Sequence, residues 1–201
     1  MSSEGKRPPL GFHPKEIKGS WDRGFVLDVH TISSTMIGYN EYGHPEFDTQ
    51  RSPLGEMVYR LKYRADKSVL PAIVETIVEF LANSGIQADV VVPVPPSKTR
   101  PHQPVIEIAS ELSNAVGIPL DSTSLTKGKA TPQMKDVGDF SERVVALQDA
   151  FSVNQNFQGK LVLLIDDLFQ SGATLNVVAA TLKKQGGAKA VNVIVLTRTR
   201  S

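Results

Sequence analysis

Cysteine is absent from the 201 residues, so the chain has no disulfide, no thiolate zinc site and no cysteine nucleophile. Long apolar runs are also missing, because no stretch approaches the roughly 18 apolar residues of a membrane-spanning helix. The first residues, MSSEGKRPPLGFHPKEIK, contain no signal-peptide core. Charge of one sign is not in excess either, since 22 basic and 21 acidic residues give a net charge of +1. We therefore expect a cytoplasmic protein with no membrane contact and no nucleic-acid partner.

Two nucleotide-binding signatures do not occur in the sequence. There is no G-x-x-x-x-G-K-[ST], which argues against a P-loop NTPase, and no G-x-G-x-x-G, which argues against a dinucleotide-binding fold. The four histidines are scattered and have no metal-ligand spacing.

The order of the predicted elements indicates an α/β protein. Ser52 and Pro53 begin one helix, and a second apolar stripe from Leu70 to Leu81 ends before Gly85. From Asp89 onward, short apolar runs alternate with helices, which is typical of a mostly parallel sheet covered on both faces. The predicted strands are 90–94, 118–125, 161–165 and 191–196, and the predicted helices are 105–116 and 173–185.

Two stretches stand apart from this alternation. Residues 1–20 have no periodicity and are predicted to be a flexible or irregular arm ahead of one domain, 21–201. Residues 126–142 also lack periodicity, and a loop of that length inside a compact domain is either a functional lid or a disordered insert.

The segment LVLLIDDLFQSGATL, residues 161–175, carries the clearest chemical signal. Asp166 and Asp167 follow a buried strand, at the sheet edge where ligands bind in such folds. We expect residues 168–172 to form a tight turn into a helix whose free N–H groups, with the hydroxyls of Ser171 and Thr174, bind an anion. A ribose 5-phosphate would satisfy both halves of this site, because its hydroxyls can donate to the two acids and its phosphate can accept from the turn.

This segment resembles the signature of the type I phosphoribosyltransferases. In that signature an apolar strand is followed by two acids and a short Thr/Ser-Gly phosphate loop. The residues that the resemblance assigns to ribose phosphate are Asp166, Asp167, Leu168, Phe169, Gln170, Ser171, Gly172, Ala173 and Thr174. Phe169 and Gln170 depart from the small or hydroxylated residues that many members carry there.

Further runs resemble the ComF-like branch of the family. They are LKYRADKS at 61–68, VVPVPPSKTR at 91–100, and Thr131-Pro132-Gln133 followed by Arg143 and Ala150-Phe151. The zinc-binding cysteines of many ComF-like proteins are absent, and Pro101 to Pro104 replaces their Gly-Phe-Asn-Gln run.

The resemblance implies a phosphoribosyltransferase-fold core, about 61–201, with a small hood, about 21–60. It implies transfer of phosphoribose from phosphoribosyl pyrophosphate to or from a nitrogenous base or a related acceptor. Pyrophosphate would be bound by Ser97, Lys98, Thr99 and Arg100, with Asp166, Asp167, Lys98 and Arg100 as the catalytic residues. Mg²⁺ would be held mainly through the ligand, with Asp166 or Asp167 as the protein's contribution. The lid would use Lys127, Gln133, Lys135 and Arg143, and a homodimer is common in the family.

A second function uses the same pocket. A regulatory protein that senses phosphoribosyl pyrophosphate without turning it over would carry the same motif. Release of pyrophosphate with any base distinguishes the enzyme from the sensor.

Overall fold

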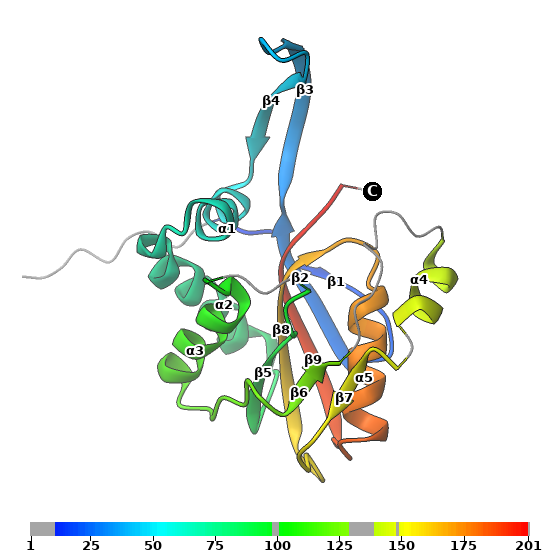
Figure 1. The fold of residues 1–201 in the computed structure, drawn as a ribbon. Helices are drawn as coiled ribbons and strands as arrows, with labels where there is room; N and C mark the ends of the chain where they lie inside the picture. Colours follow the sequence, from blue (N-terminus) through cyan, green and yellow to red (C-terminus); the bar gives the residue numbers. More distant parts are fainter. Residues whose placement is uncertain (1–10, 98–100, 129–138, 148, 201) are drawn as a thin grey trace, which may run out of the picture.

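A computed structural model describes residues 11–97, 101–128, 139–147 and 149–200 (Figure 1). Its centre is a five-stranded sheet of order β1-β2-β9-β8-β5. The strands are β1 (Lys15–Glu16), β2 (Arg23–Val29), β5 (Val90–Pro93), β8 (Leu161–Phe169) and β9 (Ala190–Arg198). β5, β8, β9 and β2 run parallel, and only β1 is antiparallel to its neighbour. The predicted α/β fold with a mostly parallel sheet is confirmed.

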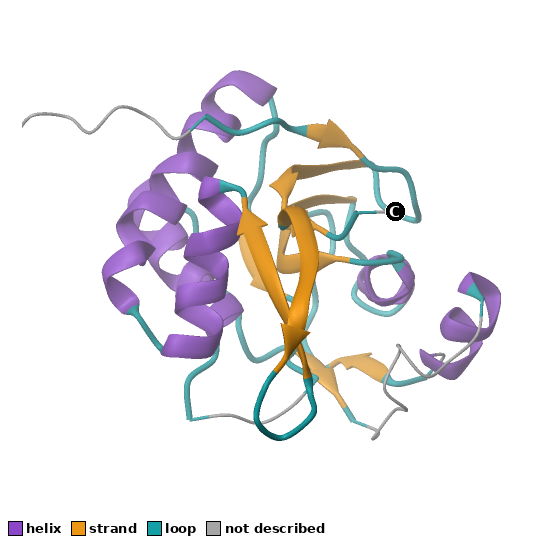
Figure 2. Ribbon diagram, turned by 90° about the horizontal axis from the view of Figure 1, so that it is seen from above, coloured by secondary structure: helices purple, strands orange, loops and turns teal. Residues whose placement is uncertain are grey.

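Helices and a small second sheet cover the two faces of the central sheet (Figures 1 and 2). One face packs against α1 (Pro53–Arg64), α2 (Leu70–Ser84) and α3 (Pro104–Val116). The other face packs against α5 (Ala173–Lys184) and the hairpin of β6 (Leu125–Lys127) and β7 (Phe151–Val153). Strands β8 and β9 are apolar on both faces because both faces are buried.

Local signals set the helix ends as the sequence predicts. The Ser52 hydroxyl accepts a hydrogen bond from the Gly55 amide at 3.0 Å and caps α1. A short 3-10 turn, η1 (Lys67–Val69), connects α1 to α2. Gly85 ends α2 in the left-handed conformation at φ 67°.

A two-stranded hairpin, β3 (Thr31–Tyr39) and β4 (Pro45–Arg51), projects away from the rest of the molecule (Figure 1). This hairpin lies between β2 and α1 in the chain. We call residues 31–51 the arm.

Two predictions between β5 and β8 are wrong. The predicted strand 118–125 is absent from this described stretch except for a single bridge between Leu120 and Val91, and β6 begins only at Leu125. The predicted loop 126–142 is occupied by regular structure at both ends, because β6 reaches Lys127 and α4 (Phe140–Leu147) begins at Phe140. Residues 129–138 lie outside the described residues.

The predicted division into a hood, 21–60, and a core, 61–201, stays a prediction. β2 nevertheless lies inside the central sheet, paired with β9. In the N-terminal stretch that is predicted to be irregular, 1–20, residues 1–10 lie outside the described part, and β1 pairs with β2. Among the described residues, no helix combines the length and the apolar character needed to cross a bilayer.

Candidate phosphoribosyl site

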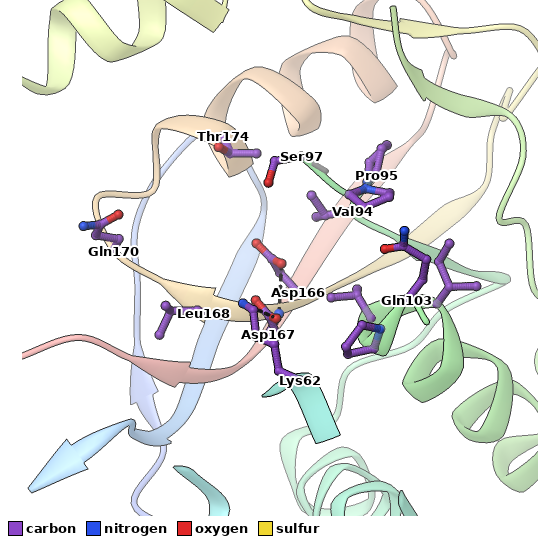
Figure 3. Close-up of a pocket in the computed structure, with 14 residues that line it drawn as sticks. Lys62, Val94, Pro95, Ser97, Gln103, Asp166, Asp167, Leu168, Gln170 and Thr174 are labelled. Carbon is purple, nitrogen blue, oxygen red and sulfur yellow. Dashed lines mark hydrogen bonds and ion pairs between the residues drawn. The ribbon is translucent and has the colours of Figure 1, made fainter. Parts of the chain in front are cut away.

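The two acids of the motif belong to β8 itself. We expected the strand to stop at Ile165 and a turn to begin at Leu168, but β8 continues to Phe169 and remains paired with β9 as far as Arg198. The expected turn is therefore shorter and lies between Phe169 and α5. Side chains alternate along a strand, so Asp166 and Asp167 point to opposite faces of the sheet. Figure 3 shows Asp166 on the side of Ser97 and Thr174, and Asp167 beside Lys62.

Asp167 is paired with a cation that the motif does not contain. The Lys62 Nζ, near the end of α1, lies 2.6 Å from the Asp167 Oδ2, and their side chains are 20% and 12% exposed. Burial alone would lower the pKa of Lys62, but the charge and hydrogen bond of Asp167 outweigh it and raise that pKa. Without a ligand, Asp167 is thus neutralised by an ammonium group that lies in the same pocket.

The backbone under Asp167 is also held in place. The Thr197 hydroxyl donates to the Asp167 carbonyl oxygen at 3.1 Å. The same hydroxyl lies 3.1 Å from Nδ1 of His30, which follows β2. Burial, together with the positive charges of Arg51 and Lys62, lowers the pKa of His30. These contacts connect the site to β9 and to the beginning of the arm.

Asp166 has a different environment from Asp167. Burial and the neighbouring Asp167 charge raise the pKa of Asp166 to about 8. Its Oδ1 accepts a hydrogen bond from the Asp167 amide at 2.9 Å, which offsets only part of this cost. Asp166 therefore holds a proton near neutral pH in the ligand-free protein, and its neutral carboxyl group can both donate and accept hydrogen bonds.

The turn that follows the acids opens onto a helix N-terminus. Gly172 precedes α5 with φ 76°, a left-handed conformation that favours glycine. An added Cβ there would lie 2.8 Å from the Phe169 ring, so glycine also allows that ring to fold over the turn. The Ser171 hydroxyl lies 3.5 Å from the Ala173 amide, and no side chain caps the helix. The first amides of α5 are suited to an anion, as the sequence predicts.

These groups surround one cavity of about 240 Å³ (Figure 3). Six of the predicted site residues line it: Ser97, Asp166, Asp167, Leu168, Gln170 and Thr174. Phe169, Ser171, Gly172 and Ala173 belong to the same turn but are not among its lining residues. Lys98, Thr99 and Arg100 lie outside the described residues, so their predicted roles stay predictions.

The predicted lid residues are not at this cavity in the described part of the chain. Lys127 lies in β6, where its Nζ is 5.7 Å from the centre of the Phe151 ring, and burial lowers its pKa. Arg143 lies on α4, and neither residue lines the cavity. Gln133 and Lys135 lie outside the described residues. The lid stays a prediction.

Sequence reasoning missed one wall of the cavity. Lys62 belongs to this wall, and the only local signal for it is a lysine beside the apolar stripe of α1, directly after the buried Leu61. The residues Val94, Pro95, Pro96, Gln103, Pro104, Val105 and Ile106 complete the lining. His102 explains why this wall meets α1, because its ring nitrogens lie 2.6 Å from the Glu107 carboxylate and 2.6 Å from the Leu61 carbonyl oxygen.

Among the described residues, no cluster of three or more histidine, aspartate and glutamate side chains could hold a metal ion. The paired carboxylates of Asp166 and Asp167 are oxygen donors of the type that Mg²⁺ prefers. They are neutralised by a proton and by Lys62, so these residues fit an ion that arrives with an anionic ligand better than one bound by the protein alone.

Several solved structures resemble the chain at low identity. Phosphoribosylpyrophosphate synthetase from Mycobacterium smegmatis is 20% identical with a TM-score of 0.39, and the match covers 65% of this chain and 33% of that one. Glutamine phosphoribosylpyrophosphate amidotransferase from B. subtilis is 21% identical with a TM-score of 0.47, covering 78% and 34%. Adenine phosphoribosyltransferase from Saccharomyces cerevisiae is 11% identical with a TM-score of 0.46, covering 84% and 85%.

The chain thus spans about a third of the length of the synthetase and the amidotransferase. Identities and TM-scores this low assign no activity or substrate. No curated protein matches the chain.

A family model gives the stronger result. The phosphoribosyl transferase domain matches residues 66–201, which include β5, the acids of β8 and the turn into α5. This match confirms the predicted family and supports the predicted enzyme class, a phosphoribosyltransferase among the glycosyltransferases. The ComF-like branch stays a prediction. The chain belongs to the phosphoribosyl transferase domain family.

Proposed function

We propose that this protein binds phosphoribosyl pyrophosphate with Mg²⁺ and transfers phosphoribose to or from a nitrogenous base or a related acceptor. One observation carries the proposal: Asp166, Asp167 and Thr174 line the same cavity, and Thr174 belongs to the first turn of α5, which no side chain caps. Phosphate and neighbouring hydroxyls on one ligand match this combination of anion site and acceptors.

The ribose phosphate takes the position between β8 and α5. Its phosphate accepts from the first amides of α5 and from the hydroxyls of Ser171 and Thr174, where the helix dipole adds about 0.3–1 kcal/mol. The two ribose hydroxyls face Asp166 and Asp167. Because a protonated Asp166 can both donate and accept, it suits a hydroxyl without the cost of a second buried negative charge.

The pyrophosphate group extends toward the loop after β5. Ser97 lines the cavity, and Lys98, Thr99 and Arg100 follow it in the sequence. Lys62 provides a further ammonium group, 2.6 Å from Asp167 and in the same cavity. Asp166 or Asp167 would contribute to holding Mg²⁺, which would supply positive charge beside the pyrophosphate.

The chemical step exchanges one bond at the anomeric carbon of the ribose for another. The bond to the pyrophosphate oxygen breaks, the acceptor nitrogen forms the new bond, and the electron pair of the broken bond leaves with pyrophosphate. The sugar gains positive character during this exchange, and the leaving group gains negative charge. The protein's part is to position the ribose and to stabilise these charges with the groups that line the cavity.

Calorimetry with phosphoribosyl pyrophosphate and Mg²⁺ tests the proposal. The double variant Asp166→Asn with Asp167→Asn should lose most of its affinity, because both hydroxyl acceptors change together. Glu75→Gln with Glu79→Gln on α2 makes the same two acid-to-amide changes away from the cavity and should bind like the parent chain. Equal affinity of the parent chain and the Asp166/Asp167 double variant would exclude this site.

Release of pyrophosphate on screening bases then identifies the reaction. Turnover with any base supports the transferase. Tight binding of phosphoribosyl pyrophosphate without turnover, together with ligand-dependent binding of a partner, would instead support the sensor that uses the same pocket.

A further inference from the structure

The arm, residues 31–51, carries most of the large hydrophobic side chains that are exposed in the described part of the chain. Six of the nine large hydrophobic side chains that are exposed in the described chain lie on it: Ile32, Met36, Ile37, Tyr39, Tyr42 and Phe47. Nothing in the described part of the chain packs over its outer half, and Figure 1 shows it projecting from the body. An isolated two-stranded hairpin is at best marginally stable in water, so a covering surface would stabilise it.

The strand register divides the arm into two unlike faces. Met36 pairs with Phe47, and Tyr39 pairs with Pro45. Along β4, Phe47 and Pro45 are two residues apart and share a face, which makes these four residues one apolar face. The side chains of Met36, Tyr39 and Phe47 on this face are 45%, 68% and 53% exposed.

The opposite face is polar and acidic. Glu46 and Asp48 alternate with Phe47 and therefore lie on this second face, opposite Gly38 and Thr35. Glu41 lies in the connecting turn at the tip. The outer half of the arm thus has an uncharged apolar face and three acids at its tip and back.

The root of the arm is basic. Arg51 ends β4 and lies over the Tyr59 ring at 3.7 Å, with Arg64 over the same ring at 5.5 Å. Arg200 donates to the Ile32 carbonyl oxygen, which brings a third arginine to the root. Glu56, 3.4 Å from Arg51, offsets part of this charge.

We propose that the arm is a self-association surface, and that two copies of this chain pair their arms antiparallel about a two-fold axis with the apolar faces together. A nine-residue strand spans about 30 Å, so the tip of one arm then reaches the root of the other. In this arrangement the acidic tip of each arm, at Glu41, lies near the basic root of the other arm, which gives two equivalent contacts. Glu46 and Asp48, on the polar face, remain exposed to water. A surface that is complementary to itself is what a two-fold homodimer requires, because each patch contacts its own copy. The inference is independent of the proposed function.

Sedimentation velocity of the full chain over a range of concentrations tests this pairing. The parent chain should dimerise, and Phe47→Glu should weaken the dimer by roughly thirty-fold or more, as expected for a central aromatic anchor. Gln50→Glu adds the same charge to the polar face of the same strand and should leave the dimer intact. A monomeric parent chain, or a Phe47→Glu variant that dimerises normally, would overturn the proposal.

Charge reversal tests the antiparallel direction. Arg64→Glu should weaken the dimer, and Glu41→Lys in the same chain should restore part of it, because positions 41 and 64 then carry opposite charges again. Failure of this rescue would contradict the tip-to-root contact.

The absence of cysteine allows a test that does not depend on the stability of a charged variant. Met36→Cys places one thiol near the centre of the paired faces and should give a covalent dimer on mild oxidation. Thr35→Cys places the thiol on the other face and should not. Equal cross-linking of the two variants would refute the apolar pairing.

Discussion

The ion pair between Lys62 and Asp167 leads to the sharpest stability prediction. Removing one partner of a fully buried pair costs about 3–5 kcal/mol, whereas a surface pair contributes about 1 kcal/mol or less. The two side chains here are 20% and 12% exposed, so the pair lies between these limits. We expect Lys62→Met to lower the free energy of unfolding by about 2 kcal/mol, because it keeps the apolar stem and leaves the Asp167 carboxylate without its cation.

The two partners should not be equivalent. Asp167→Asn leaves Lys62 on a long stem that can turn its ammonium group toward water, so this variant should lose about 1 kcal/mol or less. The double variant should be more stable than Lys62→Met alone, since no buried carboxylate remains. Urea unfolding at neutral pH in metal-free buffer measures all three. For a chain of this size, 2 kcal/mol corresponds to about 4–8 °C in Tm.

Lys67→Met is the matched control for this set. Lys67 also pairs with a carboxylate, at 3.3 Å from Glu107, but its side chain is 64% exposed. It should change stability by less than about 1 kcal/mol. If Lys62→Met and Lys67→Met cost the same, or if the Lys62/Asp167 double variant is the least stable of all, the reasoning from burial is wrong.

Three further predictions concern the site and α1. Asp166→Asn removes a carboxyl group whose pKa is raised from 3.8 to about 8 by folding. The contribution of this group to the stability of the parent chain is fully present below pH 3.8 and declines as the pH rises to about 8, because the unfolded chain loses the proton first. In metal-free buffer the variant should therefore gain stability relative to the parent chain between pH 5 and pH 8, and parallel pH profiles of Tm would contradict this. Ser52→Ala removes the cap of α1 and a 2.5 Å hydrogen bond to the Val29 carbonyl oxygen, so chemical unfolding should show a loss of about 1–2 kcal/mol. Gly172→Ala forces a side chain into a φ of 76° and against the Phe169 ring, so it should lower the free energy of unfolding by about 1–2 kcal/mol. It should also weaken phosphoribosyl pyrophosphate binding in calorimetry. An unchanged affinity would show that the turn does not contact the ligand.

The parts of the fold that the sequence predicts are those set by neighbours in the chain. The cap at Ser52, the apolar stripe of α2 and Gly85 define their helices within a few residues, and the structure confirms them. The apolar runs of β8 and β9 predict a buried parallel sheet for the same reason, because their composition leaves no polar face. The acids Asp166 and Asp167 are found at the cavity because strand ends in such sheets gather there.

The parts that were wrong or missed depend on distant partners. The adjacent acids Asp166 and Asp167 do not favour a strand, and β8 extends through them because β9 continues beside it as far as Arg198. Helix α4 was missed because its eight residues have only one buried side chain, Leu147, and so show no clear stripe. Lys62 reaches Asp167 across 105 positions of sequence, a contact that helical periodicity does not encode.

Lys62 also changes how the site should be delimited. The family match begins at residue 66, so the two acids lie inside the matched domain and their cation lies ahead of it, in α1. His102 fastens the end of α1 to the loop beside the cavity through the Leu61 carbonyl oxygen, one residue from Lys62. A fragment that begins at residue 66 would retain Asp166 and Asp167 but expose them to each other's charge without this ammonium group. Burial and the Asp167 charge raise the pKa of Asp166, and the Lys62 charge opposes them, so this carboxyl group would be more fully protonated in the fragment and a weaker partner for a cationic or metal-bearing ligand. The helix before the domain is therefore part of the electrostatics of the site.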